Sequence, residues 1–184
     1  MINNVEEILN RAINNDSVVS VFTDKTEKQK CSVGFIESFD NDFVLIRHLT
    51  MNGEADGYAL RKIENIYRID AGGIYENKLK KLFCIKKESF NIIPHNFDSD
   101  NILFNLIFYA KDFKKILEIS IDENNEQELI VGLVKSITND GNIILDKINN
   151  YGEYDGIAII NIDDIIDLNC DSKDSRDILL LLEC

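Results

Sequence analysis

The sequence has no tryptophan, one proline and two histidines among its 184 residues, and its four cysteines are scattered. The absence of a C-x-x-C pair, and of a histidine close to any cysteine, excludes a zinc-finger site and a disulfide framework. No apolar run reaches the roughly 20 residues that cross a bilayer, and no signal-peptide pattern opens the chain. We therefore expect a reduced, cytoplasmic protein that does not associate with membranes and needs no cofactor. The cysteines are Cys31, Cys84, Cys170 and Cys184.

Basic residues are also scarce, and they are unevenly placed. The chain carries 20 Lys and Arg against 33 Asp and Glu, a net charge of −13. Residues 1–98 hold 13 of these cations and 15 of the anions, whereas residues 99–184 hold 7 and 18, a net charge of −11. A phosphate backbone would be repelled by the second half. Any nucleic-acid binding is therefore expected in the first half.

The chain contains two copies of one unit. Val33-Gly34-Phe35-Ile36 in the first half corresponds to Val131-Gly132-Leu133-Val134 in the second, 98 residues later. The motif Gly-Glu-x-Asp-Gly ends at Gly57 and again at Gly156, 99 residues later, and Gly141 accounts for the extra residue. Such ordered self-similarity marks an internal duplication.

Hydrophobic periodicity and turn residues predict the same elements in each copy. The first copy should contain helices over 5–13 and 75–86 and strands over 18–22, 31–39, 43–49, 58–62 and 66–69. The second should contain helices over 101–110 and 174–183 and strands over 116–121, 129–138, 142–148, 157–160 and 165–168. We expect a short 3₁₀ turn at 63–65 and a close backbone approach or bend at Gly34 and Gly132. The predicted domains are residues 1–87 and 99–184, and the linker 88–98, which contains Pro94, is apolar enough to pack on a barrel.

This order of elements resembles the Sm-like (LSm-type) family. The family's first motif is matched in spacing by Gly34, Ile36, Phe39 with Asp40, and Phe43 with Leu45. In the second copy the matching residues are Gly132, Val134, Ile137 and Ile144. The chain also resembles bacterial two-copy proteins of this kind, from which no activity can be carried over. The resemblance implies a mainly β fold with flanking helices, a tandem duplication of an Sm-like, SH3-like five-stranded open barrel.

The chain departs from the family where the family contacts RNA. Val44 and Ile143 occupy the position of its asparagine, and Thr138 occupies the position of its aspartate in the second copy. The Ile-Arg-Gly motif is replaced by Ile63-Glu64-Asn65 and Ile162-Asp163-Asp164, so arginine is absent from both copies. The resemblance therefore supports the fold more strongly than an RNA-binding function.

The acidic Gly-Glu-x-Asp-Gly loops have two interpretations, a cation site and a structural turn. Glu54 with Asp56, and Glu153 with Asp155, are weak candidates for a divalent-cation site, because hard cations prefer carboxylate oxygens. The alternative, which the pattern favours, is that Asp-Gly makes a tight reversal into the next strand. The charged stretch 122–126 is better explained as a hairpin turn than as a calcium loop. His48 aligns with Lys147, and neither it nor His95 belongs to a catalytic arrangement, so we expect no enzyme activity.

The strongest basic and aromatic cluster lies in the first copy, and it is the candidate RNA surface together with the motif aspartate: Asp40, Arg47, Tyr58, Arg61, Lys62 and Arg68. Strand alternation would divide these residues between two faces.

The function that the sequence favours is non-catalytic: a binding or scaffolding module that acts through open strand edges and the groove between barrels. Sm-like barrels assemble by pairing the fourth strand of one barrel with the fifth of the next, within one chain or between chains. The partner is accordingly a protein or a second copy, and RNA binding by the first barrel is the alternative. The candidate edge residues are Tyr58, Leu60, Tyr67, Ile159 and Ile166.

Overall fold

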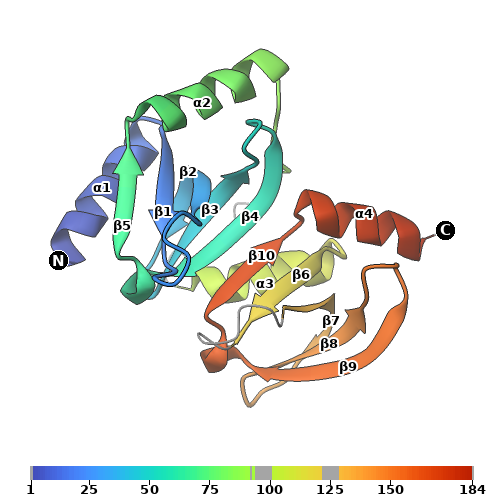
Figure 1. The fold of residues 1–184 in the computed structure, drawn as a ribbon. Helices are drawn as coiled ribbons and strands as arrows, with labels where there is room; N and C mark the ends of the chain where they lie inside the picture. The colour runs from blue at the N-terminus through green and yellow to red at the C-terminus, as the bar shows by residue number, and fades with distance from the viewer. Residues whose placement is uncertain (1, 92, 94–100, 122–128, 184) are drawn as a thin grey trace. The chain divides into compact units, whose positions relative to one another are not determined.

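The computed structural model describes residues 2–91, 93, 101–121 and 129–183, and it divides into two compact units (Figure 1). The described residues up to Asn91 belong to the first unit, and those from Leu103 onward belong to the second. The fold is mainly β in both halves, as the sequence predicted.

The first unit contains a leading helix, five strands, a 3₁₀ turn and a trailing helix. These elements are α1 (Ile2–Asn14), β1 (Val18–Phe22), β2 (Ser32–Phe39), β3 (Phe43–Leu49), β4 (Ala55–Lys62), η1 (Ile63–Asn65), β5 (Arg68–Ala71) and α2 (Ile74–Lys86).

The second unit repeats this order. Its elements are α3 (Ile102–Asp112), β6 (Ile116–Ser120), β7 (Ile130–Ile137), β8 (Asn142–Ile148), β9 (Tyr154–Asn161), η2 (Ile162–Asp164), β10 (Asp167–Cys170) and α4 (Lys173–Leu182).

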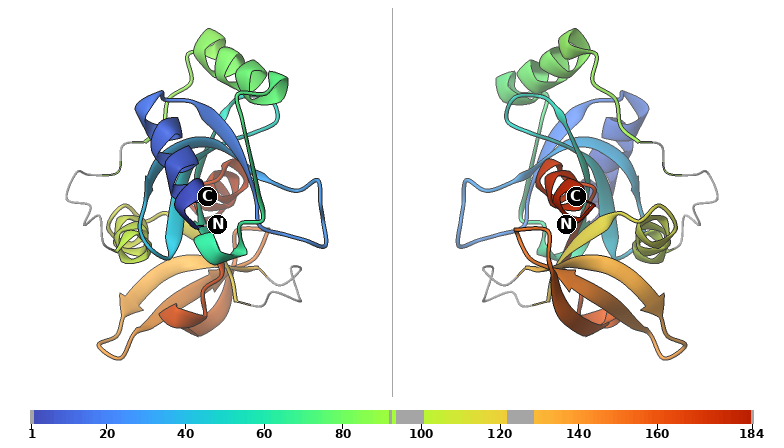
Figure 2. Two further views of the ribbon diagram at one scale, coloured as in Figure 1. Left: turned by 90° about the vertical axis from the view of Figure 1, so that its left-hand side faces the viewer. Right: turned by 90° about the vertical axis from the view of Figure 1, so that its right-hand side faces the viewer.

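The strand order is also the same in the two units. It is β5-β1-β2-β3-β4 in the first and β10-β6-β7-β8-β9 in the second, and all these pairs are antiparallel. Each unit is thus an open antiparallel sheet, in which the fifth strand returns to pair with the first. Figure 1 shows the long curve of β4 and β9, and Figure 2 shows the loop 23–31, which stands out from its sheet.

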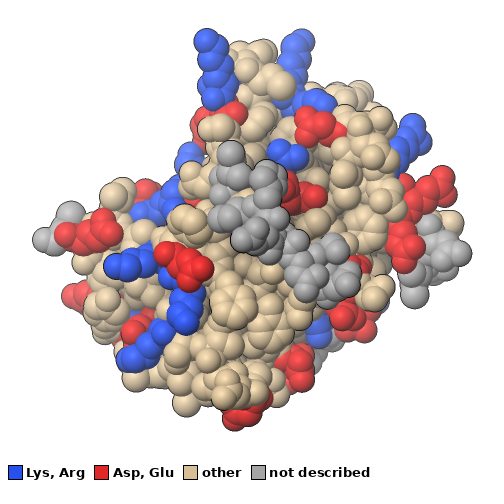
Figure 3. Space-filling model, turned by 180° about the vertical axis from the view of Figure 1, so that it is seen from behind, with Lys and Arg blue, Asp and Glu red and all other residues tan. Residues whose placement is uncertain are grey.

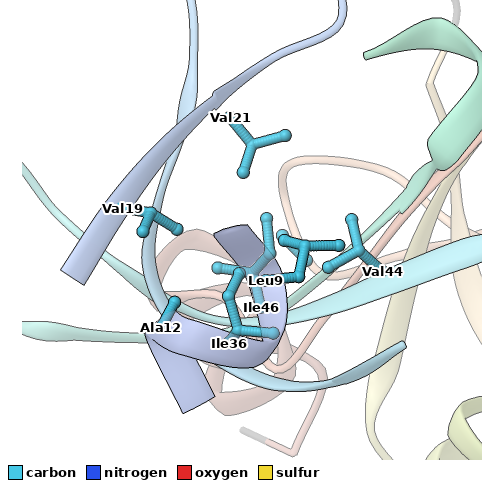
Figure 4. Packing of buried hydrophobic residues seen from close by; sticks show 8 residues of the cluster. Leu9, Ala12, Val19, Val21, Ile36, Val44 and Ile46 are labelled. Carbon is cyan, nitrogen blue, oxygen red and sulfur yellow. The ribbon is translucent and has the colours of Figure 1, made fainter. Parts of the chain in front are cut away.

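The core of the first unit lies between α1 and the concave side of the sheet. Leu9 and Ala12 from the helix point toward Val19, Val21 and other strand residues (Figure 4). The spacing of Leu9 and Ala12 places them on one helix face, and β-branched residues in alternation supply the strand side. The second unit places fully buried residues at the matching strand positions: Leu117, Ile119, Ile143 and Leu145.

A second apolar cluster of the first unit lies on the other side of β1 and β2. Val18, Val33 and Phe35 pack there with Leu79 of α2. Phe83 and Phe90 lie against the same cluster, and Phe83 contacts the ring of Phe35 edge-on at a centroid distance of 5.2 Å.

Irregularities of the ladders recur at the same positions, which supports the internal duplication. The β2–β3 register shifts between Ile36 and Ser38, and the β7–β8 register shifts between Val134 and Ser136. Each is a β-bulge of one extra residue, Glu37 or Lys135. The additional residue of the second copy lies in the β7–β8 turn, where Gly141 has a φ of 81°.

The predicted close approach at Gly34 and Gly132 is confirmed, and its cause is visible. A Cβ atom at Gly34 would lie 2.0 Å from the carbonyl oxygen of Arg47, and one at Gly132 would lie 2.5 Å from that of Asp146. Neighbouring backbone, rather than a positive φ, therefore requires glycine here.

Two sets of predicted strand bounds were wrong. β4 and β9 begin at Ala55 and Tyr154, three residues before the predicted starts, because the loop closes earlier: the amide of Gly53 donates to Thr50, and that of Gly152 to Asn149. Gly57 and Gly156 thus lie inside strands, beside a second register shift, rather than in the reversal that the sequence suggested.

The fifth strands begin later than predicted, at Arg68 and Asp167. Ile66 and Ile165 end the 3₁₀ turns, their amides donating to Ile63 and Ile162, before the chain enters the sheet. No helix in the described ranges is both long and apolar enough to span a membrane.

Candidate functional site

The two Gly-Glu-x-Asp-Gly loops are places where the trailing helix approaches the sheet. Gly53 has a φ of 70°, and a Cβ atom there would lie 2.6 Å from the Cβ of Leu82 in α2. Gly152 has a φ of 74°, and the corresponding distance to Leu181 in α4 is 2.5 Å. The first glycine of the motif is therefore required twice over, by its positive φ and by helix packing.

The carboxylates of the first loop have separate partners. Oε1 of Glu54 lies 2.8 Å from Nζ of Lys86, and Oδ2 of Asp56 lies 3.0 Å from Nδ1 of His48. These contacts tie the loop to α2 and to β3. They favour a structural role for the loop over a shared cation.

The second loop repeats the arrangement with other partners. Oδ2 of Asp155 lies 3.6 Å from Nζ of Lys147, which occupies the position of His48. Glu153 accepts a hydrogen bond of 3.1 Å from the side-chain amide of Asn149. Within the described ranges, no three Cys, His, Asp or Glu side chains are grouped as a metal site would need.

The basic residues of the candidate RNA surface are held by neighbours. Nε of Arg47 lies 2.9 Å from Glu37, and Nη2 lies 3.3 Å from Asp16. Nε of Arg61 donates to Ser32 at 2.8 Å, and Arg68 pairs with Asp70. Figure 3 shows, on one face, Lys and Arg side chains interspersed with Asp and Glu.

The remaining candidates of that surface are also engaged. Nζ of Lys62 lies 3.9 Å from Glu64, and as the neighbour of Arg61 in β4 its side chain points to the opposite face. Oδ1 of Asp40 accepts from the amides of Asp42 and Phe43 at 2.9 and 2.7 Å, so this carboxylate stabilises the β2–β3 turn. Tyr58 is only 3% exposed and donates to the carbonyl of Asn91. The structure thus does not bring these residues together as one cationic surface.

The candidate edge residues have different surroundings. Leu60 is fully buried in β4, like Tyr58. Tyr67 and Ile166 precede β5 and β10, and their amides donate to Phe22 and Ser120 of the first strands.

Ile159 is 69% exposed in β9, the outermost strand of its unit (Figure 1). Ile157 and Tyr154 of the same strand are 60% and 66% exposed. β9 is therefore the strand edge at which large apolar side chains face solvent.

The linker 88–98 was expected to pack on a barrel, and in its described part Phe90 does so, on the cluster of Val18, Val33, Phe35 and Leu79. The ring of Phe90 stacks on Phe83 at a centroid distance of 5.4 Å. Two features were missed by sequence reasoning, and one is that Phe90 makes this contact. The other is a reversed ion pair: Arg47 with Glu37 in the first unit corresponds to Asp146 with Lys135 in the second, at 3.0 Å.

The cysteines of the described residues differ in environment. Cys170 is buried, and this burial raises the pKa of its thiol well above the usual value. Cys31 is half-buried, which raises the pKa of its thiol more modestly. A raised pKa keeps the thiol protonated and unreactive, which fits a packing role. His95, Cys184 and the charged stretch 122–126 lie outside the described residues.

No protein-family model matches the chain, and neither the curated proteins nor the solved structures contain a match.

Proposed function

We propose that this protein is a non-catalytic binding and scaffolding module, built from two Sm-like, SH3-like open barrels, that associates through the edge of β9. The strand order of each unit supports the barrel assignment, because the fifth strand pairs with the first and a 3₁₀ turn separates the fourth from the fifth. The close backbone approach at Gly34 and Gly132, which recurs in both units, is consistent with the same assignment.

One observation carries the proposed function: β9 ends its sheet and exposes Tyr154, Ile157 and Ile159. Proteins normally protect such an edge with charges, prolines or a covering segment, because its unpaired backbone groups accept another strand. β9 lacks lysine and proline, and Asp155 is its one charged residue. Exposed apolar groups on an unprotected edge mark an interaction surface.

The partner strand that fits best is β5 of a second copy. β5 ends the order of the first unit, and the first half of the chain is nearly neutral, with a net charge of −2. Pairing β9 with a second β9 would instead bring together two halves of net charge −11. A contact between unlike surfaces builds a ring or a filament, which suits a scaffold.

Sedimentation velocity over a range of protein concentrations tests this function. We expect reversible association of the parent protein, and we expect Ile159→Lys to remain monomeric because a lysine on an edge strand opposes pairing. Met51→Lys is the matched control, since Met51 is 77% exposed and lies in the β3–β4 loop of the first unit. A parent that stays monomeric at the highest concentration, or an Ile159→Lys variant that associates like the parent, would refute the proposal.

A further inference from the structure

In the first unit, the segment of the chain that follows α2 packs on the sheet in the way that a bound peptide would. The helix ends at Lys86, and its C-cap residue, Lys87, has a φ of 58° and turns the chain back toward the sheet. Phe90 then lies on the apolar cluster of Val18, Val33 and Leu79. Its ring centroid is 6.5 Å from that of Phe35 and 6.2 Å from that of Tyr58. We call residues 87–91 the strap.

Polar contacts fix the strap at both ends. Oε2 of Glu88 accepts from the amide of Ala55 at 3.1 Å, and the carbonyl of Asn91 accepts from the hydroxyl of Tyr58. The guanidinium carbon of Arg47 lies 5.8 Å from the centroid of Phe90. The strap is thus held by its aromatic anchor Phe90, by the cation of Arg47 beside that anchor, and by hydrogen bonds to β4.

The second unit has a corresponding surface, and among its described residues no segment buries it as the strap buries that of the first unit. Leu133, Ile157 and Leu182 take the positions of Phe35, Tyr58 and Phe83. Ile157 is 60% exposed where Tyr58 is 3% exposed, and Leu133 is partly exposed where Phe35 is 2% exposed. Leu129, which takes the position of Cys31, is 48% exposed.

The charge beside the anchor position is reversed. Asp146 stands where the first unit has Arg47, and its carboxylate is 3.0 Å from Lys135. The second half also has a net charge of −11. A ligand for this surface should therefore carry its own cation next to its aromatic anchor, because a carboxylate stands here where the first unit has the guanidinium of Arg47.

We propose that the second unit binds, on the surface of Leu133, Ile157 and Leu182, an extended segment of a partner protein with an aromatic side chain next to a basic residue. This inference rests on the proposed function only in taking the chain to be a protein-binding module. It concerns the outer face of the sheet, where the side chain of Ile157 from β9 is exposed, and not the unpaired backbone groups along the edge of that strand.

Synthetic peptides derived from the strap provide the probe. The first has the sequence of residues 85–92 with Asn91 replaced by arginine, the second retains Asn91, and the third is the first with Phe90 replaced by alanine. Each is titrated into the full chain, at a protein concentration at which it is monomeric, and binding is followed by fluorescence anisotropy. We expect saturable binding of the first peptide, weaker binding of the second, and at least about tenfold weaker binding of the third, since a buried aromatic anchor supplies most of such an affinity.

Protein variants then locate the site. Ile157→Asp should abolish binding, and Met51→Asp, on an exposed loop of the first unit, should leave it unchanged. The double variant Lys135→Glu with Asp146→Arg reproduces the ion pair of the first unit, and it should remove the preference for the arginine peptide over the asparagine peptide.

Three results would overturn the inference: no binding of the arginine peptide, equal binding of the alanine peptide, or binding that Ile157→Asp leaves intact. The last would place the peptide elsewhere, for example in exchange with the strap of the first unit. Peptide binding by a chain that never self-associates would refute the proposed edge pairing and keep this site. Self-association without peptide binding would do the reverse.

Discussion

At the scale of single residues, the two copies keep the same contacts while exchanging the residues that make them. The hydroxyl of Ser20 in β1 donates to the buried carboxylate of Glu76 in α2 at 2.6 Å. In the second unit the strand supplies the carboxylate, Glu118, and the start of the helix supplies the hydroxyl of Ser172. In both units this contact joins the trailing helix to the first strand.

The Ser20–Glu76 contact gives the first prediction. Ser20→Ala should lower the free energy of unfolding by about 1–3 kcal/mol, because a buried carboxylate loses a hydrogen-bond donor. Adding Glu76→Leu should recover part of this loss, since removing both polar partners is less costly than removing one. Urea denaturation measures both effects. A double variant less stable than Ser20→Ala would contradict this account of the contact.

The glycines of the second strands give another prediction. Gly34→Val and Gly132→Val should each cost about 3 kcal/mol, and Gly34→Val should cost more, because its Cβ would lie 2.0 Å rather than 2.5 Å from a carbonyl oxygen. Gly141→Asn is the control: nothing lies within 4 Å of its Cβ position, and asparagine tolerates a positive φ. Thermal melts that match the parent for both valine variants would show that β2 and β3, and β7 and β8, do not approach each other at these glycines as described.

At the scale of elements, the strap acts as a structural part of the first unit. Phe90→Ala should destabilise that unit by about 2 kcal/mol, less than a fully buried phenylalanine, because Phe90 is only partly buried. Tyr151→Ala, at a residue that is 80% exposed, should be neutral. The measurement is urea denaturation of both variants, and equal stability of the two would show that the strap is not bound.

Much of the element order could be predicted from the sequence, because duplication and turn residues are local signals. β1, β3 and β8 were predicted with their observed bounds, since β-branched runs there are flanked by Asp, Asn or Gly. The starts of β4 and β9 were missed because Gly57 and Gly156 indicate a turn, whereas tertiary pairing places them inside strands. Pairing across the sheet is not a local property of the chain.

The candidate site was less predictable than the fold. The sequence identified Ile159, but it gave Tyr58 and Leu60 equal standing as edge residues, although both are buried. Whether a strand residue such as Tyr58 is covered depends on another segment of the chain, in this case the strap. The hydrophobic periodicity of the strand does not show which segment will cover it. Likewise, the basic residues of the first copy form a cluster in the sequence, but the sequence does not show that Arg47 pairs with Glu37 and Arg68 with Asp70.

At the scale of the whole molecule, the negative net charge opposes the alternative function, which is RNA binding. With a net charge of −13, and with Arg47 and Arg68 paired with carboxylates, the chain should bind RNA poorly. We expect that a titration of single-stranded RNA at low and at physiological salt gives no saturable binding at physiological salt. Tight binding that weakens steeply with salt, and that falls on Arg61→Ala with Lys62→Ala, would favour RNA binding by the first barrel.

The central claim is that β9 is an open edge that pairs with another strand, and hydrogen–deuterium exchange at low and high protein concentration tests it most directly. In the concentrated sample we expect slower exchange in peptides covering 154–161 and 68–71, the two strands proposed to pair. Ile159→Lys should abolish the difference. Exchange in these two segments that is independent of concentration, or protection that appears elsewhere and survives Ile159→Lys, would contradict the account.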